Sequence, residues 1–226
     1  MKLIVMLTHN DVTVANAKEV FESCTDLPVC HWGFKNIGLP VEEMKDLAKA
    51  IKAAGKVTHM EIVSYTEEEC LAGAKLAIEC GIDYLLGTKY FPSVAQFLKN
   101  SSTKYFPFCG DVWGSPSILG NSIEEIIEDA KRLEGLGVDG IDLLAYRFFG
   151  NSAELITQFS RSVKIPLVIA GSINSFDRLN FVNQIQPWGF TIGSALFTHQ
   201  FMNAASFRKN LICVLSYLQG IMSNKS

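Results

Sequence analysis

The 226-residue sequence lacks the marks of several protein classes. The apolar run at its N-terminus extends only from Leu3 to Leu7, which is too short for a signal peptide or a membrane span. Neither sign of charge dominates, since 20 basic and 23 acidic residues give a net charge of −3, and no basic run is present. We therefore expect a cytoplasmic protein that binds neither nucleic acid nor membranes.

The cysteines lack the spacing of a metal site or a disulfide framework. Six are present, but no CxxC pair or zinc-like pattern occurs among them. Such cysteines are typical of a reducing compartment, where they pack as small apolar residues. We predict free thiols at Cys24, Cys30, Cys70, Cys80, Cys109 and Cys213.

Strand-like apolar runs alternate with amphipathic helical stretches along the whole chain, a pattern typical of parallel α/β folds. Eight runs, each followed by a helix, predict one (β/α)₈ TIM barrel over residues 1–226. The alternative is a doubly wound open sheet, which normally carries a glycine-rich loop after its first strand. That position here, Leu7–Asn10, has no glycine. The expected strands are Lys2–Thr8, Pro28–Gly33, Val57–Ser64, Tyr84–Gly87, Tyr105–Gly110, Gly140–Tyr146, Leu167–Ala170 and Gly189–Ile192.

A faint internal repeat supports this prediction. The helix before Gly81-Ile82-Asp83 parallels the helix before Gly137-Val138-Asp139, and a strand follows each of them. Asp83 and Asp139 therefore precede their strands, at the end of the barrel opposite the expected site. We interpret both as turn or stability residues.

Two apolar segments near the C-terminus end in Gly-Ser, at 171–172 and at 193–194. A strand that stops at glycine lets the backbone approach a ligand, and the N–H groups that follow attract an anion. In a (β/α)₈ barrel the loops after strands seven and eight commonly hold a phosphate. We therefore predict that Gly171, Ser172, Gly193 and Ser194 bind the phosphate of a small-molecule substrate.

With these motifs the chain resembles the phosphate-binding TIM-barrel superfamily, which includes ribulose-phosphate epimerase, phosphoribosylanthranilate isomerase and the ketodeoxy-phosphogluconate aldolases. The resemblance implies a sugar-phosphate-like substrate. No member family's catalytic motif matches. The first strand lacks the cysteine of the anthranilate isomerases, the Asp-x-Lys-x-x-Asp of the orotidylate decarboxylases is absent, and strand Gly140–Tyr146 lacks the Schiff-base lysine of the aldolases.

Two carboxylates interrupt apolar strands. The two-residue period of a strand places Glu61 and Asp142 on inward faces. An ionised carboxylate there is costly unless it is paired, and a buried one can serve as a general base. We predict that Glu61 and Asp142 exchange protons with the substrate. Structural hydrogen bonds or ion pairs inside the barrel are the alternative.

Cationic and polar side chains follow several strand ends. Lys35 and Lys89 are candidates to stabilise a developing oxyanion or to form a Schiff base, with solvated loop lysines as the alternative. Lys89 is favoured because it follows a glycine at a strand mouth. Arg147 closes the sixth strand and is suited to grip a carboxylate or a phosphate. Asn10 ends the first strand and is expected to line the mouth.

Two histidines raise the question of a metal. His31 and His59 lie in adjacent expected strands, at positions that resemble the metal-bearing strands of pentulose-phosphate epimerases. The aspartates that accompany those ligands are absent, so we predict no metal and place both histidines among the substrate-lining residues. Histidines satisfied within the core are the alternative. The long segment 111–121 is a candidate lid.

These residues predict an enzyme, most simply an isomerase or epimerase that abstracts a proton next to a carbonyl of a phosphorylated metabolite. A carbon–carbon lyase or aldolase is the first alternative. An FMN- or nucleotide-phosphate-binding barrel, an oxidoreductase or non-catalytic, is the second, since the same Gly-Ser segments suit the FMN phosphate. No cofactor is predicted, with FMN or a divalent metal as alternatives. A homodimer is also an expectation, although no surface stripe identifies its interface.

Overall fold

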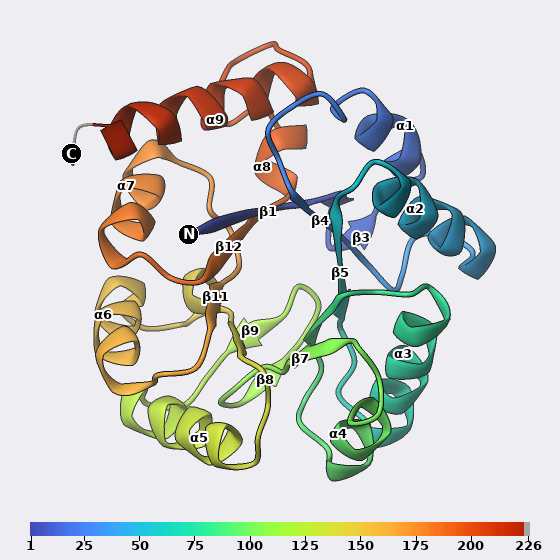
Figure 1. The fold of residues 1–226 in the computed structure, drawn as a ribbon. Helices are drawn as coiled ribbons and strands as arrows, with labels where there is room; N and C mark the ends of the chain where they lie inside the picture. The colour runs from blue at the N-terminus through green and yellow to red at the C-terminus, as the bar shows by residue number, and fades with distance from the viewer. Residues whose placement is uncertain (224–226) are drawn as a thin grey trace.

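A computed structural model describes residues 1–223 and confirms the predicted barrel. Within these residues eight parallel strands form its wall, in the spatial order β10-β11-β12-β1-β4-β5-β6-β7 (Figure 1). An isolated parallel bridge between Phe108 and Asp142 joins the two ends of the sheet. The wall strands are β1 (Lys2–Met6), β4 (His31–Lys35), β5 (Val57–Ile62), β6 (Tyr84–Gly87), β7 (Lys104–Phe106), β10 (Ile141–Leu143), β11 (Leu167–Ile169) and β12 (Gly189–Ile192).

Helices surround the wall as an outer ring (Figure 1). Each main helix turns an apolar stripe inward; in α5 the buried residues Ile126, Ala130 and Leu133 are spaced by three or four positions. Ser122 and Glu125 begin that helix as a capping box. The helices are α1 (Ala17–Glu22), α2 (Val41–Ala53), α3 (Glu67–Glu79), α4 (Pro92–Leu98), α5 (Ile123–Gly135), α6 (Ser152–Ser162), α7 (Phe176–Ile185), α8 (Ser194–Phe197) and α9 (Phe207–Ser223).

The inside of the barrel is filled with side chains. Ile4, Met6, Leu86, Phe106 and Val168 form one buried cluster there. A packed interior is usual for this fold, and it leaves the ends of the strands as the places where a ligand can bind.

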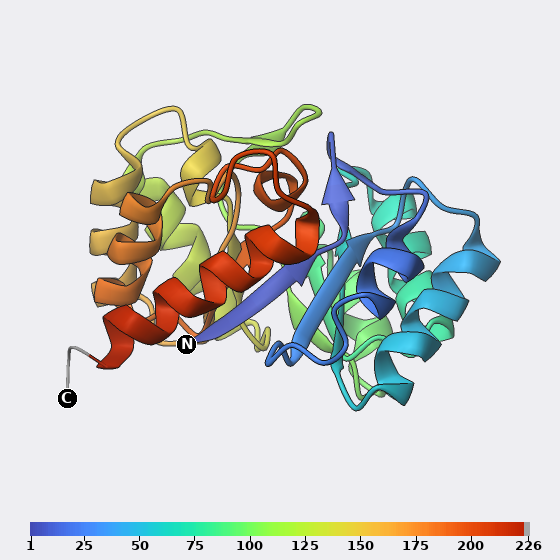
Figure 2. The same ribbon diagram turned by 90° about the horizontal axis from the view of Figure 1, so that it is seen from above.

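Two short hairpins extend from the carboxyl ends of the strands, on the same side of the barrel (Figure 2). The first, β2 (Thr8–His9) with β3 (Val12–Thr13), directly follows β1. The second, β8 (Val112–Trp113) with β9 (Ile118–Leu119), lies within the predicted lid segment. The Tyr65 hydroxyl lies 2.6 Å from Ser117 Oγ and ties this second hairpin to the end of β5.

Two strand boundaries differ from the prediction in ways that matter for the site. The second wall strand begins at His31, three residues later than expected, and ends at Lys35, two residues later than expected. Lys35 therefore belongs to the wall rather than to a loop. The sixth ends at Leu143, and the 3₁₀ turn η1 (Ala145–Arg147) follows it. These boundaries decide which side chains reach the mouth of the barrel.

The cysteines within residues 1–223 are free thiols, as predicted. Most of them are buried, and Cys30 is exposed. In the described part of the chain, we find no helix with the length and apolar character needed to cross a membrane.

Candidate active site

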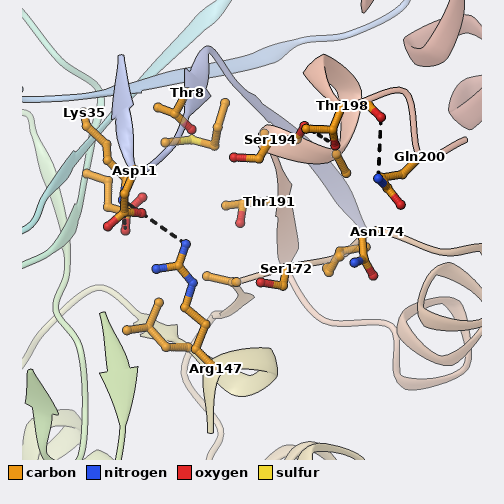
Figure 3. Close-up of a pocket in the computed structure, with 18 residues that line it drawn as sticks. Thr8, Asp11, Lys35, Arg147, Ser172, Asn174, Thr191, Ser194, Thr198 and Gln200 are labelled. Carbon is orange, nitrogen blue, oxygen red and sulfur yellow. Dashed lines mark hydrogen bonds and ion pairs between the residues drawn. The ribbon is translucent and has the colours of Figure 1, made fainter. Parts of the chain in front are cut away.

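A cavity of about 230 Å³ opens at the carboxyl ends of the strands (Figure 3). Its lining comes from β1, β4, β5 and β12, from the hairpin tip after β1, and from the loops after β10, β11 and β12. One side carries backbone and hydroxyl groups, and the other carries charged side chains. This is the end of the barrel where enzymes of this fold keep their active sites.

The two Gly-Ser segments meet at this cavity. Gly171, Ser172, Gly193 and Ser194 all line it. Gly171 and Ser172 adopt left-handed backbone angles, with φ of 83° and 31°. A Cβ on Gly171 would lie 2.9 Å from Arg147 Cγ. The four predicted residues therefore line one cavity. At Gly171 the backbone lies so close to its neighbour that no side chain would fit between them.

Further polar residues, which the sequence pattern did not indicate, surround this side. Thr191 lies two positions before Gly193, so the strand period alone places both on one face. Thr198 donates a hydrogen bond to the Ser194 carbonyl over 3.0 Å and braces that loop. Asn174 and Gln200 complete this polar wall (Figure 3).

Four charged residues form the opposite side. Lys35 Nζ lies 2.6 Å from Asp11 Oδ1 and 3.5 Å from Glu61 Oε1. Arg147 Nη2 lies 3.1 Å from the same Asp11 oxygen. Burial alone would raise the pKa of Asp11, but the ion pairs with Lys35 and Arg147 outweigh it and hold that pKa below its usual value. The cluster thus combines two cations with two carboxylates.

The sequence placed His9, Asn10 and Asp11 together at the mouth of the barrel but selected Asn10 as the site residue, whereas Asp11 is the one that lines the cavity. The two residues form the tip of the β2–β3 hairpin, both with left-handed φ, 49° for Asn10 and 65° for Asp11. This turn directs Asp11 toward Lys35, whereas Asn10 is exposed and does not line the cavity. An Asn-Asp pair between two strand-like dipeptides was the available signal for such a turn.

Asp142 is buried inside the barrel, 1% exposed. Neither of its carboxylate oxygens accepts a hydrogen bond of ordinary geometry. Burial, and secondly the charge of nearby Glu61, raise the pKa of Asp142 well above its usual value, while Lys35 and the Gly87 amide oppose that increase. Asp142 therefore favours its neutral, protonated form. It does not line the cavity.

Comparison with known proteins bears on the fold. The sequence matches no protein-family model and no curated protein. An orotidine 5'-phosphate decarboxylase from Pyrococcus horikoshii OT3 superposes with a TM-score of 0.71 at 12% identity, over 96% of this chain and 99% of that one. The chain thus shares the TIM-barrel fold of this decarboxylase.

Two other solved structures give the same result. An N-acetylmannosamine-6-phosphate 2-epimerase from Clostridium perfringens has a TM-score of 0.63 at 13% identity, with 86% of each chain covered. An N-(5'-phosphoribosyl)anthranilate isomerase from Pyrococcus furiosus has a TM-score of 0.64 at 14% identity, over 97% of this chain and 99% of that one. At such identities the likeness concerns the fold alone.

Within this TIM barrel, Lys89 does not join the cavity. It forms an ion pair with Asp111 over 3.2 Å and lines a separate depression beside α5. Of the two candidate lysines, therefore, Lys35 and not the favoured Lys89 lies beside Glu61. Lys35 reaches Glu61 because β4 ends two residues later than the sequence indicated.

The histidines lie away from the cavity, toward the amino ends of β4 and β5. The His59 ring is fully buried and stacks on Tyr84, while Trp188 covers His31 edge-on. The expectation that both histidines line the substrate site is corrected accordingly. His59 shares the inward face of β5 with Glu61, as the strand period predicted, but one layer deeper. Among residues 1–223 no group of three or more His, Cys, Asp or Glu residues is placed to hold a metal.

Proposed function

We propose that this chain is an enzyme that moves a proton at a carbon next to a carbonyl group of a small phosphorylated metabolite, as an isomerase or epimerase does. One observation carries the proposal: the Lys35–Glu61 ion pair faces the same cavity as the two Gly-Ser loops. An epimerase and an isomerase of phosphorylated compounds, by their names, share the fold.

In this proposal the phosphate lies at the Gly-Ser side. Backbone N–H groups of the 171–172 and 193–194 loops donate hydrogen bonds to its oxygens, as in other concave backbone anion sites. The hydroxyls of Ser172 and Ser194 add side-chain donors there (Figure 3). Binding the phosphate at this end leaves the rest of the substrate against the charged side.

The charged side then supplies the proton chemistry. Glu61 takes the proton from carbon, and the Lys35 ammonium stabilises the negative charge that develops on the carbonyl oxygen. Asp142 stays neutral behind them because two close carboxylates in a buried site do not both ionise readily. Asp142 does not line the cavity, so Glu61 is the carboxylate that both takes the proton and returns it to the substrate.

The alternatives receive less support from the geometry. A Schiff-base aldolase needs a free amine, whereas Lys35 is paired with both Asp11 and Glu61. A flavin nucleotide needs a large cavity, and about 230 Å³ lies below the range of roughly 300–1,000 Å³ usual for drug-sized ligands. A small metabolite without a cofactor fits better.

Deuterium exchange tests the proposal before the natural substrate is identified. Aldose phosphates, ketose phosphates and phosphorylated keto acids are incubated with the protein in D₂O, and exchange at the carbon next to the carbonyl is followed by NMR. The wild type should exchange at least one of them. Glu61→Gln should slow that exchange by about 10²–10⁴-fold, the usual contribution of a general base, while phosphate binding persists. Equal exchange by both proteins would assign Glu61 a structural role and refute the mechanism.

A further inference from the structure

Arg147 already holds a carboxylate, and that carboxylate belongs to the chain itself. One guanidinium nitrogen donates to Asp11 Oδ1 over 3.1 Å, and another donates to the Ser117 carbonyl over 3.4 Å. Asp11 is partly enclosed, its side chain 11% exposed. Asp11 accepts from one nitrogen of the guanidinium, and the planar fork of a guanidinium can hold a carboxylate with two.

This guanidinium adjoins the proposed phosphate site. The stem of Arg147 packs so closely on Gly171 that an added Cβ there would lie 2.9 Å from Cγ. Figure 3 shows the side chain extending from beside Ser172 toward Asp11. A ligand with its phosphate at the Gly-Ser loops therefore has Arg147 within reach of a neighbouring group.

The charges of the cavity limit what Arg147 can take in addition. Lys35 and Arg147 are balanced by Asp11 and Glu61. A ligand carboxylate added to this set would place three carboxylates against two cations in a half-enclosed space. An entering carboxylate also competes with Asp11 directly, because Asp11 and the Ser117 carbonyl already accept hydrogen bonds from the two terminal nitrogens of Arg147.

Asp11 is the one placed to leave. It lies at the tip of a two-residue turn, whereas Glu61 belongs to the barrel wall. The base of that hairpin is fixed, because Thr13 Oγ1 donates to the Lys35 carbonyl over 2.8 Å and accepts from the Lys35 N–H over 2.9 Å. Release of the Asp11 side chain leaves this anchor in place.

We infer that Arg147 is a carboxylate-binding subsite which Asp11 fills in the unliganded chain, and that the substrate is a phosphorylated carboxylic acid whose carboxylate displaces Asp11. The inference rests on the proposed phosphate site. It makes Arg147 and Asp11 residues that determine specificity. It also couples binding to chemistry, because the departure of Asp11 removes the nearer partner of Lys35 and turns that ammonium toward the substrate.

Two probes that differ only in the carboxylate test this. Calorimetry compares D-3-phosphoglycerate with D-glycerol 3-phosphate, in which a hydroxymethyl group replaces the carboxylate and the configuration at the central carbon is the same. The wild type should bind 3-phosphoglycerate about ten- to a hundredfold more tightly, as expected for a charge-assisted hydrogen-bonded pair. Arg147→Met, which keeps the stem against Gly171, should lose this preference and leave glycerol 3-phosphate binding within about threefold of the wild type. Lys89→Met, which removes one positive charge outside the cavity, is the control and should keep the preference.

Asp11→Asn gives the opposite signature. It removes the competing carboxylate, so the preference for 3-phosphoglycerate should increase by about tenfold. The inference is overturned if the wild type binds both probes equally, if Arg147→Met weakens both by the same factor, or if Asp11→Asn weakens 3-phosphoglycerate. If Arg147→Met does not fold, comparing the two probes on the wild type and on Asp11→Asn still tests the inference. If neither probe nor inorganic phosphate binds, the phosphate site itself is wrong, which is a separable result.

Discussion

The imidazole Nδ1 of His31 lies 2.9 Å from Nε2 of His59, across neighbouring strands near the amino ends of the barrel. At this distance one nitrogen donates and the other accepts, so the contact requires an unprotonated nitrogen. Burial lowers the pKa of His31 to about 4, and burial followed by the charge of His31 lowers the pKa of His59 well below its usual value. The contact between the two histidines is therefore favoured when both rings are neutral.

The histidine pair should make the barrel sensitive to acid. An unfolded histidine takes up its proton near pH 6.5, whereas folded His31 does so only near pH 4. Between these values the unfolded chain binds more protons, so the free energy of unfolding should decrease as the pH falls from 6.5 to 4, by about 1–2 kcal/mol for the partly exposed His31. Urea denaturation at pH 7 and pH 5 measures the change.

The matched control for this prediction is His31→Gln, which keeps a hydrogen-bonding group without a titration. Asp142 acts with the opposite sign, because its raised pKa means that the folded state binds the extra proton as the pH falls. This contribution is common to both proteins. The variant should therefore lose less stability than the wild type between pH 7 and pH 5. Identical losses would contradict the assignment to His31.

Replacing Lys35 should destabilise the protein strongly. Lys35 is 4% exposed, and its removal takes the cation away from Glu61 and leaves Asp11 paired with Arg147 alone. Lys35→Met should lower the free energy of unfolding by about 3–5 kcal/mol, the usual effect of breaking a buried ion pair. Adding Glu61→Gln to Lys35→Met should restore part of the lost stability. Urea denaturation of the two single variants and of the double variant gives the coupling free energy between the two side chains. Strict additivity would show that the two side chains act independently.

Replacing one glycine at the cavity and one away from it distinguishes the cost of left-handed backbone strain from the loss of a contact at the ligand site. Gly171 and Gly137 share a φ of 83°, but only at Gly171 would a Cβ meet another group. Alanine at either position should reduce stability by about 1–2 kcal/mol through the left-handed backbone. Gly171→Ala should in addition displace the Arg147 stem and weaken phosphate binding, measured by calorimetry. Equal phosphate binding by the two variants would separate Gly171 from the anion site.

An anion should appear between the two Gly-Ser loops in crystals grown with phosphate. Its oxygens should lie within hydrogen-bonding distance of backbone nitrogens in both loops, 171–172 and 193–194. At about 100 times its dissociation constant the ion should also add about 2.7 kcal/mol to the free energy of unfolding, visible as a higher melting temperature. Density at only one loop would refute a shared phosphate site.

Features that depend on a local pattern were predictable. The repeat that includes Asp83 and Asp139 is one case: Asp83 accepts a hydrogen bond from the Thr58 N–H over 2.8 Å, and Asp139 accepts one from the Tyr105 N–H over 2.9 Å. Each carboxylate thus secures the start of the preceding strand. Their position at the end opposite the cavity follows directly from their place before a strand.

Features that depend on where a strand ends were not predictable. Lys35 and Lys89 follow similar apolar runs, and only the observed end of β4 places Lys35 within reach of Glu61. The prediction that His59 faces inward was correct, but the alternation of side chains along a strand does not tell how deep in the barrel a residue lies. The role of Asp11 was not predictable because a two-residue turn decides which of two adjacent polar side chains, Asn10 or Asp11, faces the cavity.

The seam of the barrel has a consequence for its motions. Neighbouring wall strands elsewhere share a registered ladder. Between β7 and β10 the structure has instead the isolated bridge from Phe108 to Asp142, the hydrogen bond from the Asp142 N–H to the Pro107 carbonyl, and the contacts of Asp139 with the Tyr105 backbone. Proline has no N–H to donate, so the ladder is thin at this point. Amides there should exchange with solvent before those of β4 and β5. The buried acid Asp142 lies at this seam, so local opening of the barrel there would expose its carboxyl group to water.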